Sequence, residues 1–325
     1  MNTPTRLGAY ALGLVAVFGA AAGIGSAVGP VGAVAGETAG HGAAPHGGTP
    51  AASSGDPAAV PPADQAAGQL PGGLQVSADG YTLDAAGTLP AGAATPVSFR
   101  VLGPDGQPVT AYDTAHDEDL HLIAVRRDLT GYQHVHPDMA ADGTWSVPLD
   151  LTAGSWRLFA DLDPAGPAEP LVLGTDVAVA GDLVPQPLPQ PSATAEVDGY
   201  TVTLDGGLAP GQESGLTLSV SRDGQPVTDL QPYLGAYGHL VALRDGDLAY
   251  LHVHPAGEPG DGVTAPGPDV TFSATAPSAG DYRLFLDFRH GDVVRTAEFT
   301  VRAGDPAAAP ASGTAGHADD GHAHD

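Results

Sequence analysis

The chain has 325 residues, with 38 acidic against 11 basic side chains and a formal charge of -27. Such an acidic protein repels nucleic acid and anionic membrane surfaces, so we expect no nucleic-acid partner. The absence of cysteine excludes disulfide bonds, thiolate metal sites and a cysteine-linked lipid anchor. The 46 glycines and 31 prolines indicate that much of the chain forms turns, linkers and tails rather than helix.

The N-terminus carries an apolar segment. Leu7 to Val28 contains no charged residue, follows the single basic residue Arg6 and precedes Ala33-Val34-Ala35, which fits the small-x-small pattern of signal-peptide cleavage. Residues 1–35 are therefore predicted to be a signal peptide or membrane anchor, with the remainder exported, extracellular or anchored facing outside. We expect contact with a membrane only through this segment.

Three further segments are of low complexity. Residues 36–73, rich in Ala, Pro, Gly and Ser, predict a disordered linker, and the proline-rich residues 182–192 predict a stiff spacer. Residues 304–325 predict a disordered tail rich in His and Asp. Such a tail either binds divalent metal weakly or serves only solubility.

Between these segments the sequence occurs twice. The segment YQHVHP at Tyr132–Pro137 returns as YLHVHP at Tyr250–Pro255, and AGSWRLF at Ala153–Phe159 returns as AGDYRLF at Ala279–Phe285. Matching positions lie 118 residues apart as far as the HVHP element and 126 apart beyond it, because the second copy has a longer loop. Gene duplication is the economical explanation.

Each copy has the pattern of an all-β domain. Short runs such as Val97–Leu102 and Leu120–Arg126 are separated by Gly, Pro and Asp turn signals, and no window shows a sustained helical period. The sequence therefore predicts an all-β fold of two tandem immunoglobulin-like β-sandwich domains, over residues 74–181 and 193–303.

Three histidines recur in each copy. His134 and His136 are two residues apart, so on a strand they lie on one face, as do their counterparts in the second copy. Asp245-Gly246 is a strong signal for a two-residue hairpin turn, which places His239 opposite His252. Each copy is therefore predicted to carry a three-histidine hairpin face: His121, His134 and His136 in the first, and His239, His252 and His254 in the second.

Three imidazoles on one face are a known way to bind copper or zinc. Asp161 and Asp287, at equivalent places in the late strand, are candidates for a fourth ligand or for orienting a histidine N–H. Met1 and Met139 are the only thioethers, which disfavours Cu(I). The competing interpretation is a metal-free cluster facing the sandwich core, because apolar residues share the face with the histidines. His116 and His290 lack counterparts and are weaker candidates.

Several of these motifs carry a resemblance. Leu120–Ile123, Arg127–Leu129, His134–Pro137 and Trp156–Asp161 resemble uncharacterised exported proteins of actinobacteria with a repeated HxHP and YRLFxDF module. Some of those proteins are labelled heavy-metal-binding, and they look distantly like the YtkA/FixH type of extracytoplasmic immunoglobulin-like domain. The resemblance implies a sandwich fold and metal handling, chiefly of copper, outside the cytoplasm, but no established activity.

The leading hypothesis is an extracytoplasmic metal-binding protein, not an enzyme, that sequesters or delivers Cu(II) or Zn. Its partners would be the metal ion and a membrane metal transporter. One alternative is a metal-free structural or interaction module at the cell surface, and another is a zinc-dependent hydratase or hydrolase. Two equivalent sites in tandem favour binding, as does the lack of a nucleophile motif, a phosphate loop or a paired acid-base signature in the sequence.

Overall fold

The computed structural model describes residues 70–166, 168–251 and 253–304. The predicted signal or anchor segment, nearly all of the first linker, His252 and the His/Asp-rich tail from residue 305 onward lie outside the described residues. The described residues belong to one compact unit, Pro62–Asp325. Within them every regular element is a strand, and no helix is long and apolar enough to cross a bilayer.

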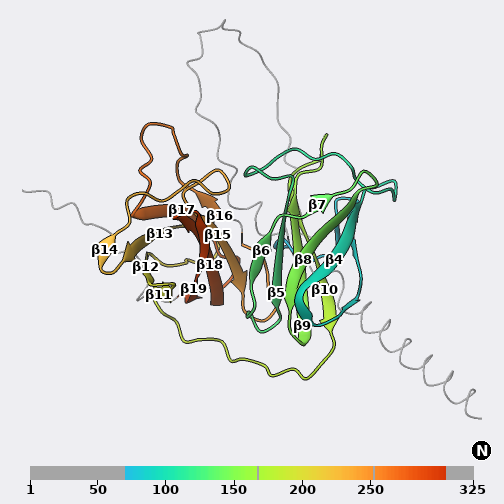
Figure 1. The fold of residues 1–325 in the computed structure, drawn as a ribbon, viewed down its shortest axis with the longest axis horizontal. Coiled ribbons are helices and arrows are strands. Elements are labelled where there is room, and N and C mark those ends of the chain that lie inside the picture. Colours follow the sequence, from blue (N-terminus) through green and yellow to red (C-terminus); the bar gives the residue numbers. More distant parts are fainter. Residues whose placement is uncertain (1–69, 167, 252, 305–325) are drawn as a thin grey trace, which may run out of the picture. The chain divides into compact units, whose positions relative to one another are not determined.

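The first repeat consists of two five-stranded sheets (Figure 1). One has the order β1-β2-β4-β8-β7: β1 (Ser77–Ala78), β2 (Tyr81–Ala85), β4 (Gly92–Leu102), β8 (Thr144–Leu151) and β7 (Asp138–Met139). The other has the order β3-β10-β9-β5-β6: β3 (Thr88–Leu89), β10 (Leu171–Val179), β9 (Gly154–Leu162), β5 (Leu120–Arg126) and β6 (Gln133–Val135). One buried apolar cluster joins both sheets, so the repeat is a sandwich.

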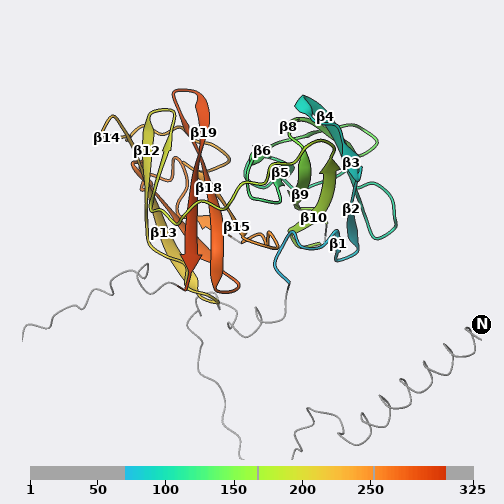
Figure 2. The same ribbon diagram turned by 90° about the horizontal axis from the view of Figure 1, so that it is seen from below.

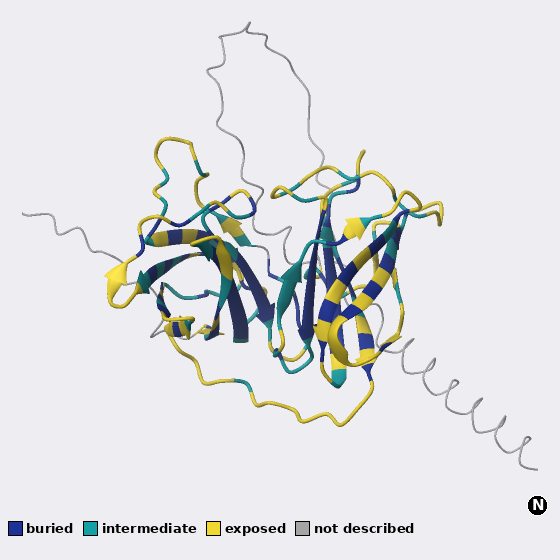
Figure 3. Ribbon diagram, in the orientation of Figure 1, coloured by how far each residue is buried: buried dark blue, intermediate teal, exposed yellow. Residues whose placement is uncertain are grey.

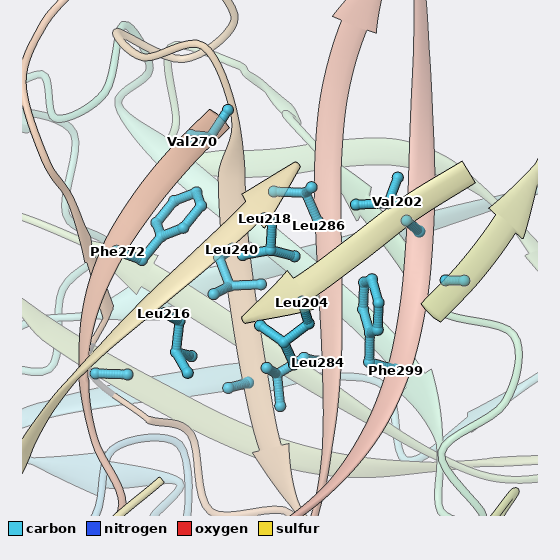
Figure 4. Packing of buried hydrophobic residues seen from close by; sticks show 14 of the residues in the cluster. Val202, Leu204, Leu216, Leu218, Leu240, Val270, Phe272, Leu284, Leu286 and Phe299 are labelled. Atoms are coloured by element: carbon cyan, nitrogen blue, oxygen red, sulfur yellow. The ribbon is translucent and has the colours of Figure 1, made fainter. Parts of the chain in front are cut away.

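The second repeat, yellow to red in Figures 1 and 2, has the same plan. One sheet has the order β11-β12-β13-β17-β16, with β14 paired to β13: β11 (Thr194–Val197), β12 (Tyr200–Asp205), β13 (Glu213–Arg222), β14 (Gln225–Pro226), β17 (Asp269–Thr275) and β16 (Val253–Pro255). The other is β15-β18-β19: β15 (His239–Arg244), β18 (Gly280–His290) and β19 (Val293–Ala303). Leu218 and Phe272 of one sheet pack against Leu284 and Phe299 of the other (Figure 4). The predicted class of tandem immunoglobulin-like sandwiches is confirmed.

Burial separates two kinds of strand (Figure 3). In β8, TWSVPLDL, buried and non-buried residues alternate along the strand, as expected where one face meets the core and the other meets water. In β5, LHLIAVR, the first six residues are all buried, and β18 has a run of seven buried residues. Both faces of these strands are therefore covered.

The second face of β5 and β18 is covered by the other repeat. Leu120, Leu122 and Ala124 belong to the core of the first sandwich, whereas Ile123 and Val125 belong to a separate cluster. This interface cluster consists of Ile123, Val125, Leu129 and Phe159 of the first repeat and Val241, Leu243, Leu248 and Phe285 of the second. The competing prediction that the histidine face points into its own sandwich core is therefore wrong, because that face is buried between the two sandwiches.

The interface cluster uses equivalent positions of the two repeats. Ile123 and Val125 match Val241 and Leu243 at the repeat spacing of 118 residues. Tyr132 stacks on Phe285 of the other repeat, with ring centroids 4.0 Å apart. The two sandwiches thus pack like the subunits of a two-fold dimer, in which one surface patch meets its own equivalent.

Candidate metal centre between the repeats

The strand register pairs one histidine with one aspartate in each repeat. His121 of β5 lies opposite Asp161 of β9, and His239 of β15 lies opposite Asp287 of β18. Directly opposed residues on antiparallel strands point to the same face, with Cβ atoms about 5 Å apart. The late strand therefore neighbours the histidine strand in both repeats, a relation that the sequence alone leaves open.

The hairpin register differs from the predicted one by two residues. His134 pairs with Ile123 rather than with His121. In the second repeat Leu243 pairs with Tyr250, so the turn is longer than the Asp245-Gly246 signal indicates. The predicted pairing of His239 with His252 involves a residue outside the described ones and stays a prediction.

The extra turn residues include one leucine in each repeat. Leu129 and Leu248 both adopt a φ of 62°, and their side chains are buried in the interface cluster. Burying that leucine accounts for the longer turn, because the gain in apolar burial exceeds the cost of a left-handed backbone at one residue. A shift of two residues keeps the side-chain face, so His134 still lies on the face of His121.

The two HVHP segments then diverge. In the first repeat β6 stays beside β5, whereas β16 pairs with β17, where His254 lies opposite Ser273 and is exposed. His254 therefore lies in the wall of the same cleft as His121 and His239 but in neither group of candidate metal ligands, and His252 lies outside the described residues. As metal ligands, both stay predictions.

The histidines of the first repeat contact one another and also residues of the second repeat. The Nδ1 atom of His121 lies 3.1 Å from Nε2 of His134, and Nδ1 of His134 lies 2.9 Å from Oδ2 of Asp287. The His239 ring is stacked on the His121 ring at 5.7 Å and lies 4.7 Å from that of His134.

These side chains form two overlapping groups, in each of which the candidate ligand atoms lie within 4.8 Å of one another. The first donor set is His121, His134 and His136, and the second donor set is His134, His239 and Asp287. The first comes wholly from one repeat. It is the cluster predicted for the first repeat. The second donor set combines one histidine of the first repeat with two residues of the other. The cluster predicted for the second repeat includes His252, which lies outside the described residues, so it stays a prediction.

A chain of hydrogen bonds determines where protons lie in this centre. The carbonyl of Ala115 can only accept, so Nε2 of His121 donates to it at 3.0 Å. In a neutral His121 the Nδ1 atom is then the acceptor, and Nε2 of His134 donates to it. The pair of His134 and Asp287 therefore shares one further proton between Nδ1 and Oδ2, and it is neutral overall.

Burial sets the charge state of the cluster. Burial lowers the pKa of His121 to about 4 and holds the pKa values of His134 and His239 well below the usual range, with repulsion from neighbouring histidines acting in the same direction. Burial also raises the pKa of Asp287 to about 7. The imidazoles are therefore neutral at pH 7, which is the form that binds metal.

Two buried ring nitrogens have no hydrogen-bond partner among the described residues. They are Nε2 of His136, in the first donor set, and Nδ1 of His239, in the second. A buried polar atom without a partner costs about 1–3 kcal/mol, so native structures rarely retain one without a reason. A metal ion bound to these nitrogens would supply the missing partners, and the donors present fit an ion that prefers imidazole.

Neighbouring residues support the cluster. Thr296 donates to Oδ1 of Asp287 at 2.6 Å, and Tyr132 donates to Oδ2 at 3.4 Å. The ring of His116 lies 6.0 Å from that of His121 and 5.8 Å from that of His239. His116 is therefore near the cluster, although the sequence makes it a weaker candidate. The role of Thr296 has no signal in the sequence, since it comes from strand pairing alone.

Two other candidates lie apart from both donor sets. Asp161 accepts from Tyr250 of the other repeat at 3.3 Å, and burial raises its pKa to about 6. Its assignment as a ligand stays a prediction. His290 lies between the Tyr200 hydroxyl, at 2.6 Å, and Asp229, at 3.1 Å, and belongs to neither set.

An acidic cleft of about 1350 Å³ opens beside the cluster, and four histidines lie in its wall: His116, His121, His239 and His254. Its described lining contains no lysine or arginine and six carboxylates: Asp79, Glu118, Asp119, Asp161, Asp163 and Glu169. Carboxylates concentrated around a concave surface raise the local concentration of cations. The cleft therefore gives a cation a route to the histidines.

A protein-family model matches both repeats, over residues 75–177 and 195–305, and is described as "Domain of unknown function (DUF8832)". The match covers the two sandwiches. The heavy-metal label and the YtkA/FixH likeness that the motifs predict stay predictions.

No curated protein matches the sequence. Among solved structures, the adhesin InvE of Yersinia pseudotuberculosis is 15% identical with a TM-score of 0.21, covering 70% of this chain and 60% of that one. Invasin, described as a bacterial integrin-binding protein, is 14% identical with a TM-score of 0.20, over 70% of this chain and 40% of that one. The chain thus spans less than two thirds of either relative. Likenesses at these scores say nothing about what the protein does.

Proposed function

The chain belongs to the family described as Domain of unknown function (DUF8832), whose description assigns no activity, and we propose from the site itself that the protein binds a transition-metal dication between its two repeats. The ligands would come from the two donor sets, with His134 and Asp287 spanning the interface. The proposal keeps the predicted site of the first repeat and joins it to a second donor set that needs both repeats.

The observation that carries this proposal is the pair of unpartnered ring nitrogens. Within the described residues, His136 Nε2 and His239 Nδ1 are buried without a hydrogen bond. Both residues belong to a donor set in which one candidate ligand atom of each residue lies within 4.8 Å of the others. A bound cation would give each nitrogen the partner that it lacks and would offset the cost of burying it.

The surroundings resemble those of metal-ligating histidines. A ligating histidine typically donates its second ring N–H to a carbonyl or carboxylate, which fixes the tautomer. His121 does so with Ala115, leaving Nδ1 directed at His134. The 3.1 Å between the two ring nitrogens is close to the roughly 3.3 Å between two imidazole nitrogens on one tetrahedral zinc.

The donor chemistry favours Cu(II) or Zn(II). Imidazole suits both ions, a carboxylate completes either, and the sequence has no cysteine to favour softer metals. We propose that the protein sequesters or delivers such an ion outside the cytoplasm. The apolar segment Leu7 to Val28 supports export, and the acidic cleft supports cation capture.

One observation favours the metal-free alternative. The hydrogen bonds from Ala115 through His121 and His134 to Asp287 are continuous without an ion, so most of the cluster is satisfied by its own groups. In that case the histidines would serve only to dock the repeats. Binding measurements separate the two functions, because a docking role needs no metal.

The test uses the full chain with five histidines of the linker and tails replaced by serine, because these could bind metal on their own: His41, His46, His317, His322 and His324. Zn(II) and Cu(II) are titrated by calorimetry and the bound metal is counted after gel filtration. We expect tight binding that is lost in His134→Ala. His254→Ala should retain it, because His254 lies outside both donor sets.

His290→Gln is the matched control, since it changes a second-repeat histidine that lies in neither donor set. Loss of binding in His254→Ala with retention in His239→Ala would favour the predicted cluster within the second repeat. No binding in the parent would leave the docking function. That the protein is not an enzyme stays a prediction, which assays of CO2 hydration and ester hydrolysis on the metal-loaded protein would test.

A further inference from the structure

His134 belongs to both donor sets, and its two ring nitrogens face different ones. We propose that the centre holds two metal ions, one in each donor set, bridged by the imidazole ring of His134. This inference rests on the proposed metal-binding function and specifies how many ions the same centre takes and how they are connected.

The first argument is the direction of the two nitrogens. Nε2 of His134 faces Nδ1 of His121 at 3.1 Å, and Nδ1 of His134 faces Oδ2 of Asp287 at 2.9 Å. The lone pairs of an imidazole point away from each other in the ring plane, so one ion cannot use both. An ion between His121 and His134 therefore leaves the other nitrogen of His134 directed at Asp287.

The second argument is that each set has its own unsatisfied donor. His136 belongs to the first set and His239 to the second, and neither Nε2 of His136 nor Nδ1 of His239 has a partner among the described residues. A single ion would satisfy one of these nitrogens and leave the other buried without a partner. Two ions satisfy both, so the pairing of one orphaned nitrogen with each set indicates two positions.

The third argument is that the shared ring is held in place. The side chain of His134 is only 2% exposed and that of Asp287 only 3%. Asp287 is fixed in turn by Thr296, which donates to its other oxygen. A buried ring with defined partners on both edges cannot rotate to offer one nitrogen alone, so both nitrogens stay directed at their respective sets.

The charge and proton balance is simple. Each nitrogen of His134 gives one lone pair to one ion, and the proton on its ring leaves to solvent. The proton shared with Asp287 leaves as well, so that the carboxylate binds the second ion. The resulting imidazolate and carboxylate offset part of the ions' charge, and the six carboxylates of the acidic cleft offset more.

The experiment counts the ions and tests the bridge, using the full chain without the five linker and tail histidines. Cu(II) is added stepwise, bound copper is measured by elemental analysis and the electron paramagnetic resonance signal is recorded. We expect two copper ions per chain, with a signal that grows to one equivalent and falls as the second enters. Exchange coupling through one imidazolate would cause that fall. With one copper and one zinc the full signal should remain.

Variants assign the two positions. His136→Ala and His239→Ala should each reduce the copper count from two to one by removing a ligand from one set only. His134→Gln, which keeps the ring's approximate volume, should abolish coupling. His290→Gln should leave two coupled ions. Circular dichroism and thermal unfolding establish that each variant is folded.

The outcomes are distinct from those of the proposed function. One ion per chain, or two ions with an undiminished copper signal, would overturn the bridged pair while leaving metal binding intact. No bound ion would overturn the proposed function itself, and the bridged pair with it.

Discussion

Asp161 and Asp287 occupy equivalent strand positions but meet different surroundings. Asp287 receives hydrogen bonds from Thr296 and Tyr132 and contacts His134, whereas Asp161 has Tyr250 as its described side-chain partner. A buried carboxylate with few donors is costly in its charged form. Asp161 therefore opposes folding at neutral pH in the absence of metal.

Asp161→Asn should stabilise the protein in a pH-dependent way. Burial raises the folded-state pKa to about 6, above an unfolded value of about 3.9. The folded state holds the proton more tightly, so the cost is absent below pH about 4, grows as pH rises and is complete above pH about 6. We expect a gain of about 1–3 kcal/mol at pH 8 and none at pH 4, measured by urea denaturation without metal.

The control is Asp205→Asn, which changes an exposed aspartate on β12. It should leave the free energy of unfolding nearly unchanged at both pH values. An equal gain from Asp161→Asn at pH 8 and pH 4 would contradict a charge effect.

Thr296→Val should weaken metal binding without touching a ligand atom. The threonine hydroxyl donates to Asp287 at 2.6 Å and orients the carboxylate, and the loss of such a supporting bond commonly costs about 10–100-fold in metal affinity. Calorimetry should show that loss with an unchanged number of ions. Thr203→Val, on an exposed position of β12, should keep the parent affinity.

At the scale of elements, β5 shows what a sequence can predict and what it cannot. The run LHLIAVR is typical of a strand, and period two places His121 on one face with Ile123 and Val125. The error of two residues in the hairpin register left that face unchanged. The residues that cover this face could not be predicted from the sequence, because they lie more than a hundred residues away along the chain.

The second donor set, which combines residues of both repeats, could not be predicted from the sequence for the same reason. Local spacing predicts clusters within one hairpin, and the first repeat does bring His121, His134 and His136 together. Nothing local indicates that β16 pairs with β17 and leaves His254 exposed, or that Asp287 meets His134. Those contacts follow from the packing of whole sheets.

Phe285→Leu tests whether docking of the two sheets supports the centre. Phe285 is fully buried in the interface cluster and stacks on Tyr132. The substitution should cost about 1 kcal/mol of stability and should also weaken metal binding, because His239 and Asp287 must stay docked to His134. Phe299→Leu makes the same change inside the second sandwich. It should cost similar stability but leave the metal affinity unchanged, as measured by thermal unfolding and calorimetry.

At the scale of the whole molecule, the two repeats pack against each other through equivalent faces. The interface cluster joins like surfaces of two copies, as in a dimer whose subunits are linked in one chain. The segment between Val179 and Thr194 is the covalent link between the sandwiches, and most of it is exposed. The association of the sandwiches should therefore depend on the interface and the metal rather than on the link.

Cutting that link should leave the repeats together when metal is bound. A protease site inserted between Gln190 and Pro191 would allow cleavage of the folded protein. At a free metal concentration 100 times the dissociation constant, the docked state gains about 2.7 kcal/mol, or about 100-fold in association. Gel filtration should show one complex with metal and, at low protein concentration with chelator, separate fragments. Equal elution under both conditions would contradict a metal that spans the interface.

The contact between His134 and Asp287 joins residues 153 positions apart in the chain. Closing so long a loop has a large entropic cost, which each sandwich must first offset by folding and which docking then completes. Because a chain is synthesised from its N-terminus, the first repeat can fold long before residue 287 exists. The first donor set can therefore form before the second, which is incomplete on any nascent or truncated chain that ends before residue 287.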